Sequence, residues 1–149
     1  MSRRLKVSAA QLGPINLADS RASVVKRMVE MLKEADSRGS KFVVFPELAL
    51  TTFFPRWWME DQAEVDRYFE AQMPSPETLP LFELARSKGI GFYIGYAELT
   101  EEEGKTRRFN SNQLYVEVIE KMIKRTSRIA AATNASHHMR RKFAAGFFA

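Results

Sequence analysis

Four consecutive apolar residues, Phe42 to Phe45, constrain the fold of this chain more than any other feature. A strand with one face in water alternates apolar and polar residues, so a run without alternation requires apolar cover on both faces. Strands of this kind are typical of the centre of an α/β sheet. Pro46 ends the run, because proline has no N–H to donate to a neighbouring strand. The run therefore predicts a sheet strand with helices packed against the sheet.

A helix is predicted just before this strand, from about Ser20 to Arg38. Its apolar residues recur every three or four positions, so one stripe faces the core while charged residues face water. Asp19 or Ser20 can cap the amino terminus of this helix. Gly39 can end it, because glycine adopts the left-handed conformation at little cost.

The rest of the chain extends this alternation of helices and strands. Further strands are predicted at 5–12, 90–99 and 109–118, the last two separated by a charged turn at 101–108. Further helices are predicted at 63–71 and from Ser75-Pro76 to Gly89. With the short helix at 63–71 left aside, the order strand, helix, strand, helix, strand, strand predicts an α/β fold with a mostly parallel sheet.

The composition excludes several kinds of active site. The 149 residues include no cysteine, so this chain supplies no disulfide, no thiolate metal ligand and no cysteine nucleophile. The two histidines, His137 and His138, have no acidic residue near them in sequence, and we expect a solvated pair rather than a metal site. No apolar run approaches the roughly 18 residues of a membrane span, and the amino terminus does not resemble a secretory signal. We therefore expect no membrane contact and a cytoplasmic location.

The sequence divides at about residue 120. Seven Lys or Arg residues and no Asp or Glu lie from Lys121 to Ala149, so this alanine-rich tail carries a formal charge of +7 and residues 1–120 carry −2, for a total of +5. We expect residues 1–120 to form the folded part and 121–149 to be a divergent basic tail. An out-of-frame reading of a GC-rich gene is one origin for such a tail, and a natural arm is another. The short basic cluster from Arg140 to Lys142 is weak evidence for nucleic-acid binding, which we do not expect.

Glu47 is the sharpest candidate for chemistry. It directly follows the buried strand, at the strand end where α/β proteins place their active sites. Its apolar neighbours predict a recess in which the carboxylate is poorly solvated and suited to accept a proton from a nucleophile. The alternative is that Glu47 caps a turn or pairs with Arg56.

Four aromatic side chains follow Glu47 closely in sequence. They either line the entrance to a site or an oligomer contact, or belong to the core, which is the commoner role for aromatic clusters. These residues are Phe53, Phe54, Trp57 and Trp58. Asn110, further along the chain, is expected to satisfy a turn rather than to bind substrate.

The segment Phe45-Pro46-Glu47-Leu48, preceded by a strand, a helix and Ala10-Gln11-Leu12-Gly13-Pro14, resembles the opening of the nitrilase (carbon–nitrogen hydrolase) superfamily. Within that superfamily, residues 45–57, FPELALTTFFPRW, are similar to the N-carbamoyl-D-amino-acid amidohydrolases. Three later segments continue the similarity, at 89–92, 95–99 and 107–111. The resemblance covers about residues 1–114, and its specificity comes from the length of the first segment.

This resemblance implies part of an α-β-β-α sandwich and a Cys-Glu-Lys triad. In the family a cysteine thiolate attacks the carbamoyl carbon, a glutamate acts as general base, and a lysine stabilises the oxyanion. The products are the D-amino acid, carbon dioxide and ammonia. The resemblance implies no metal or organic cofactor, an N-carbamoyl amino acid as the small-molecule partner, and homo-oligomers of the intact enzyme. Only the glutamate carries over, as Glu47.

The chain departs from the family at the other two catalytic positions. The family's lysine stands in a Tyr-Arg-Lys-x-His-Leu motif, but the comparable stretch here is 124–129, where Lys124 lacks the motif and is expected to be solvated. The family's cysteine lies on a later strand. We therefore expect an amino-terminal portion of such a hydrolase, inactive by itself. The alternative is a non-catalytic binding or oligomerisation module that uses the basic tail as a further contact.

Half of a two-sheet sandwich leaves one sheet face uncovered. We expect this apolar face to include Val43, Phe45 and the strand from Ile90 to Tyr96.

Overall fold

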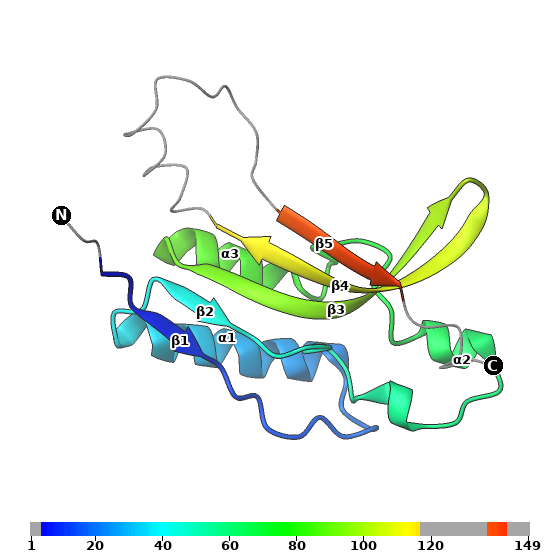
Figure 1. Cartoon of the computed structure of the whole chain (residues 1–149). Helices are drawn as coiled ribbons and strands as arrows, with labels where there is room; N and C mark the ends of the chain where they lie inside the picture. The colour runs from blue at the N-terminus through cyan, green and yellow to red at the C-terminus, as the bar shows by residue number, and fades with distance from the viewer. Residues whose placement is uncertain (1–3, 117–136, 143–149) are drawn as a thin grey trace.

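One sheet of five strands organises the residues that the structure, a computed structural model, describes, namely 4–116 and 137–142 (Figure 1). The strands lie in sequence order across the sheet. They are β1 (Val7–Ala9), β2 (Phe42–Val44), β3 (Gly91–Glu102), β4 (Lys105–Tyr115) and β5 (His137–Lys142). The pairs β1–β2 and β2–β3 are parallel, whereas β3–β4 and β4–β5 are antiparallel. The α/β fold class is as predicted.

The prediction of a mostly parallel sheet is right only for the first three strands. β3 and β4 form a hairpin through Glu103 and Gly104, whose φ angles are 53° and 72°. A two-residue turn with positive φ at both positions matches the right-handed twist of the flanking strands, and it turns the chain back on itself. The charged turn predicted over 101–108 is therefore two residues long, and its flanks belong to the strands.

Two helices cover one face of the sheet, α1 (Arg21–Ser37) and α3 (Leu79–Lys88) (Figure 1). The predicted boundaries of α1 are confirmed, with the Ser20 side chain accepting a hydrogen bond from the backbone N–H of Ser23. The α3 helix begins later than its Ser75-Pro76 signal suggested. Residues 75–78 form a turn instead, in which the N–H of Ser75 donates to the Thr78 hydroxyl at 2.7 Å. Gly89, at a φ of 57°, ends α3 as expected.

Two shorter helices lie between β2 and α3. The 3-10 helix η1 spans Phe54–Arg56, and α2 spans Gln62–Asp66. The short helix predicted over 63–71 thus exists but ends earlier. Together these helices carry the chain from the end of β2 around to the start of α3.

The main core lies between the sheet and the helices α1 and α3. Aromatic rings fill its centre, with Phe92 of β3 4.9 Å from Phe82 of α3 and 5.3 Å from Tyr115 of β4, measured between ring centroids. Val43, Phe45 and the even-numbered residues from Ile90 to Tyr96 are all buried in this core. The prediction that they form an uncovered face is therefore wrong.

The uncovered face of the sheet consists of the alternate residues. Val7 is 50% exposed and Val44 is 38% exposed, because successive side chains of a strand point to opposite faces. Farther along β3 the same face is covered by a second apolar cluster, in which Ala97 packs with Leu48, Phe54 and neighbouring residues. The helices α1 and α3 thus cover one face of the sheet, whereas the other face is covered only at the end of β2 and along the second half of β3. The predicted apolar cover on both faces of the run 42–45 is therefore wrong at Val44.

The part of the tail that the structure describes is β5, which pairs with β4 from Leu114↔His137 to Phe109↔Lys142. His137, His138 and the basic cluster at 140–142 therefore lie in an edge strand. Lys124 lies outside the described residues. Over the described ranges, no helix has the length and apolar character to cross a membrane.

Candidate active site

The loop after β2 positions Glu47 by continuing alongside β3. The N–H of Phe45 donates to the carbonyl of Tyr93 at 2.8 Å, and the N–H of Ala49 donates to the carbonyl of Gly95 at 2.8 Å. Glu47 lies midway between these two anchors. Its backbone is therefore held at both ends by a central strand, as the position after a buried strand predicted.

Gly95 lets this loop lie close against β3. A Cβ built on Gly95 would lie 2.9 Å from the Cα of Glu47, 3.2 Å from the backbone nitrogen of Leu48 and 3.2 Å from Asn112 Oδ1. Contacts this short with backbone atoms are relieved only if the backbone moves. A glycine inside a strand often marks a place where another backbone approaches closely, so Gly95 could have indicated this contact from the sequence.

Leu48 turns the chain so that neighbouring side chains diverge. Its φ is 47°, in the left-handed region that costs a residue with a Cβ about 1–2 kcal/mol. Its side chain is buried in the second apolar cluster, which offsets that cost, while Glu47 faces outwards. Backbone conformations of this kind are found preferentially at functional sites.

Asn110 of β4 is the hydrogen-bond partner of the Glu47 carboxylate. The Asn110 side-chain amide Nδ2 donates to Oε1 of Glu47. Asn110 lies in the middle of β4, paired with Ala97 of β3, rather than in a turn. The prediction for Asn110 was wrong because the hairpin turn is confined to residues 103–104.

The predicted apolar recess around Glu47 is wrong. Glu47 is exposed, and so are three of the four aromatic residues expected near it, with Trp58 at 76%. Only Phe54 enters the core, where its ring stacks on Tyr68 at 4.9 Å. Phe53 precedes η1 and Trp57 and Trp58 follow it, and these three side chains are exposed.

Glu47 lines a hollow of about 290 Å³ at this end of the sheet. The wall is formed by three segments of chain together with Arg56. The segments are Leu12–Ile15, Pro46–Ala49 and Thr51–Phe53. The charged side chains in this lining are those of Glu47 and Arg56, so a small molecule in the hollow meets one group of each sign.

The Arg56 guanidinium lies over the ring of Trp57, 5.3 Å from its centroid. Within the described residues, no carboxylate oxygen approaches it within the 4.0 Å of an ion pair. The alternative in which Glu47 pairs with Arg56 is thus replaced by the Glu47–Asn110 hydrogen bond. Arg56 remains available to an anionic group in the hollow.

Two groups of ion pairs anchor the segments on either side of this hollow. The first joins the start of α1 to the segment before α3. Arg21 pairs with Glu70 and Glu77, and also donates to the carbonyl of Arg67 at 3.0 Å. Burial raises the pKa of Glu70, and the positive charge of Arg21 partly opposes that shift.

The second group ties α2 to β4. Both oxygens of the Asp66 carboxylate accept from Arg108, at 2.6 and 2.7 Å. This bidentate hydrogen bonding holds the pKa of Asp66 below its usual value. The segment that carries η1 and Arg56 is therefore anchored to the sheet beyond Glu47.

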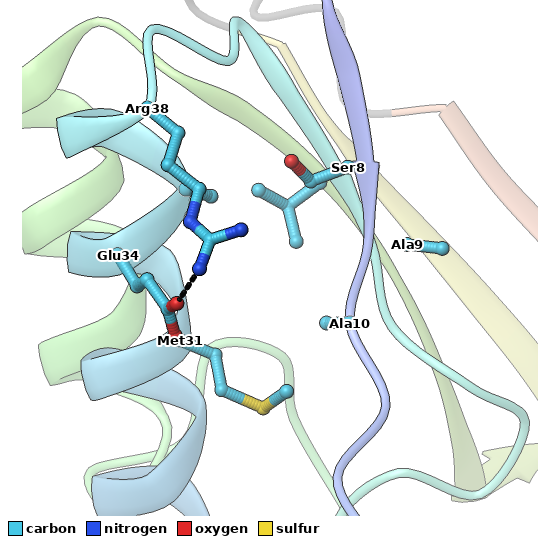
Figure 2. Close-up of a pocket in the computed structure, with 8 residues that line it drawn as sticks. Ser8, Ala9, Ala10, Met31, Glu34 and Arg38 are labelled. Atoms are coloured by element: carbon cyan, nitrogen blue, oxygen red, sulfur yellow. Dashed lines mark hydrogen bonds and ion pairs between the residues drawn. The ribbon is translucent and has the colours of Figure 1, made fainter.

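A second hollow, of about 150 Å³, lies between β1 and α1 (Figure 2). Glu34 and Arg38 extend from the helix on one side of it, and Ser8 lies on the strand opposite. Arg38 forms an ion pair with Glu34 at 2.5 Å, and the hydroxyl groups of Ser8 and Ser40 are hydrogen-bonded at 2.5 Å. These polar groups are thus already partnered, whereas Arg56 in the Glu47 hollow has no carboxylate partner within the described residues.

Comparisons with known proteins agree with this architecture. The chain is similar to a carbon–nitrogen hydrolase from Helicobacter pylori G27, with 14% identity and a TM-score of 0.59 over 91% of this chain and 40% of that one. It is also similar to Nit3 of Saccharomyces cerevisiae, a member of branch 10 of the nitrilase superfamily, with 16% identity and a TM-score of 0.62 over 92% and 44% of the two chains. The NitN amidase from Nesterenkonia sp. AN1 is similar as well, with 14% identity and a TM-score of 0.56 over 77% of this chain and 40% of that one.

These similarities show the fold, and this chain spans less than half the length of each of those structures. The sequence profile of the carbon–nitrogen hydrolases matches residues 6–134, which is most of the chain. The chain belongs to the carbon–nitrogen hydrolase family.

Proposed function

We propose that this chain carries the general-base part of a hydrolase site for N-carbamoyl-D-amino acids and has no hydrolytic activity by itself. The observation that carries the proposal is Glu47, held by Asn110 at the wall of a hollow that also presents Arg56. Family membership supports hydrolysis of a carbon–nitrogen bond. The finer assignment of substrate rests on the similarity of residues 45–57 to the N-carbamoyl-D-amino-acid amidohydrolases.

The chemistry assigned to Glu47 is proton transfer. Its Oε1 accepts the hydrogen bond of Asn110, so Oε2 is left to take the proton of an attacking thiol. The thiolate then forms a bond to the carbamoyl carbon, and the protonated Glu47 returns the proton to the departing nitrogen. The chain contains no cysteine, so the thiol comes from another polypeptide segment. The related amidase from Nesterenkonia sp. AN1 is described with an active-site cysteine.

Arg56 supports a substrate that carries a carboxylate. Its guanidinium lines the same hollow as Glu47 and has no carboxylate partner within the described residues. The α-carboxylate of an N-carbamoyl amino acid would supply the missing negative charge. Apolar residues of the wall, Leu12, Ile15 and Phe53, offer contact to its side chain.

The proposal is tested by complementation. The purified chain is mixed with a carboxyl-terminal polypeptide of an N-carbamoyl-D-amino-acid amidohydrolase that carries the cysteine and the lysine motif, and assembly is verified by gel filtration. Release of D-phenylalanine from N-carbamoyl-D-phenylalanine is then measured, with the L-enantiomer in parallel. We expect no turnover by the chain alone and turnover of the D-substrate by the assembled mixture.

The Glu47→Gln variant should lower the activity of the mixture by about 10²–10⁴-fold, the usual contribution of a general base. Glu60→Gln, which changes an exposed carboxylate elsewhere on the loop, is the matched control and should leave activity unchanged. Turnover by the isolated chain would overturn its proposed inactivity. An assembled mixture that is equally active with Glu47→Gln would overturn the role of Glu47.

A non-catalytic oligomerisation module is the second candidate, with a second copy of the chain as partner. The apolar residues on the uncovered sheet face, Val7 and Val44, favour it. Sedimentation equilibrium would show a dimer that Val44→Asp dissociates. A monomer at all concentrations rules this candidate out.

A further inference from the structure

Arg56 differs from three other arginines of the described chain in what holds its side chain. Arg21, Arg67 and Arg108 each pair with at least one carboxylate. The Arg56 guanidinium has no carboxylate partner within the described residues and instead lies over the ring of Trp57, with its central carbon 5.3 Å from the ring centroid. Its positive charge is therefore attracted by a ring rather than neutralised by an anion.

The backbone of Arg56 is fixed by the η1 helix. The ring of Phe54, the first residue of η1, is buried and lies 4.9 Å from Tyr68 and 5.4 Å from Phe69. The N–H of Arg56 donates to the carbonyl of Phe53 at 3.2 Å. These contacts hold the backbone but not the guanidinium. Because an arginine side chain has large rotamer entropy, its guanidinium needs a contact of its own to stay in one place.

A tryptophan ring holds a cation in a way that a carboxylate does not. The face of the ring attracts the positive charge, yet it has no oxygen to accept the hydrogen bonds of the guanidinium. A carboxylate partner from the chain would occupy the same N–H donors that a ligand carboxylate needs. Arg56, which lines the hollow, is thus held by Trp57 with its charge uncompensated.

We propose that Trp57 is a positioning residue, which acts through Arg56 to make the hollow selective for ligands that carry a carboxylate. This inference rests on the function proposed above, in that the ligand of the hollow carries a carboxylate. Trp57 is not among the residues that line the hollow, and its side chain is 46% exposed. Its contribution to binding therefore depends on Arg56 and on a negative charge in the ligand.

The experiment compares two ligands that differ in charge at one group. N-carbamoyl-D-phenylalanine carries a carboxylate at pH 7, whereas N-carbamoyl-D-phenylalaninamide has a neutral amide of similar size at the same place. Dissociation constants for both ligands are measured on the full chain by NMR titration. Wild type should bind the carboxylate ligand about tenfold more tightly, as expected for hydrogen bonds between charged groups. Arg56→Gln should lose this preference.

Trp57→Leu should lower the preference for the carboxylate about two- to fivefold, the size of a cation–π contact at an exposed site. Trp57→Phe keeps a ring and should retain part of the preference. Trp58→Leu is the matched control, because it removes the same type of side chain at the next position, where the ring is 76% exposed, and it should retain the full preference. In an Arg56→Gln background, Trp57→Leu should have no further effect on the preference.

A second measurement requires no ligand. The ring current of a tryptophan shifts the resonances of protons that lie over its face. The Nε–H signal of Arg56 should therefore move in Trp57→Leu and stay in place in Trp58→Leu. Both tryptophans are exposed, so the melting temperatures of the two variants should agree within a few degrees, and a change in preference is then not an effect of unfolding.

A preference that is unchanged in Trp57→Leu, or that falls equally in Trp58→Leu, overturns this inference. An Arg56 signal that does not respond to Trp57→Leu overturns it as well, as does a wild type that binds the two ligands equally or binds neither. Failure of the proposed function gives a different pattern. In that case Trp57→Leu still lowers the preference for the carboxylate ligand, but the complementation mixture hydrolyses neither enantiomer.

Discussion

Replacing Gly95 by alanine tests whether the close approach of the Glu47 loop to β3 is required by the fold. In a strand with no steric conflict, Gly→Ala stabilises a protein by about 0.4–1 kcal/mol, because alanine has less conformational entropy to lose on folding. Here the added Cβ would lie 2.9 Å from the Cα of Glu47, and 3.2 Å from the nitrogen of Leu48. Both are backbone atoms, so no side-chain rotation relieves the contact.

We therefore expect the opposite sign. Overpacking of this kind costs about 1–3 kcal/mol. For a chain of this length, about 1 kcal/mol corresponds to roughly 4 °C in melting temperature, so the Gly95→Ala variant should melt about 4–12 °C below wild type. Urea denaturation followed by circular dichroism gives the same difference as a change in the free energy of unfolding.

The local effect is measured independently. Because the loop must move away from β3, the side-chain amide signals of Asn110 should shift in the NMR spectrum of Gly95→Ala. Thr100→Ala, on the same strand and away from the loop, is the control and should change the free energy of unfolding by no more than about 0.5 kcal/mol. A Gly95→Ala variant that is more stable than wild type, with unchanged Asn110 signals, would refute the steric argument.

Three further predictions follow from the ion pairs and the core. Arg108→Gln should destabilise the protein by about 1 kcal/mol at pH 7. This difference should shrink when unfolding is measured below about pH 4, because the lowered pKa of Asp66 contributes stability that is lost as its carboxylate becomes protonated. Burial raises the pKa of Glu70, so the folded state holds this proton more tightly and stability falls as pH rises above the usual pKa of a glutamate. Glu70→Gln should remove that slope, and an identical slope in urea titrations of both proteins contradicts the assignment. Phe92→Ala should cost about 3–5 kcal/mol, whereas Trp58→Ala should cost less than about 0.5 kcal/mol by thermal melting, since the first ring is fully buried and the second is 76% exposed.

Local sequence determined the elements that depend on neighbouring residues. The apolar stripe of α1 and its caps were sufficient to predict its boundaries. The run from Phe42 to Phe45 predicted the strand β2, but not that Val44 would be exposed. The sequence also predicted that Glu47 directly follows that strand. Periodicity and capping act within a few residues, so a single sequence contains them completely.

Only the tertiary structure decided what surrounds Glu47. Its partner Asn110 is 63 residues away in sequence and reaches it because the hairpin turn at 103–104 brings β4 back beside β3. The aromatic neighbours Phe53, Trp57 and Trp58, which predicted an apolar recess, are exposed because they flank η1 and pack into neither apolar cluster. Which face of β2 and β3 is covered was likewise set by where the helices pack. Contacts between distant strands depend on the register of the whole sheet, and no short-range pattern specifies that register.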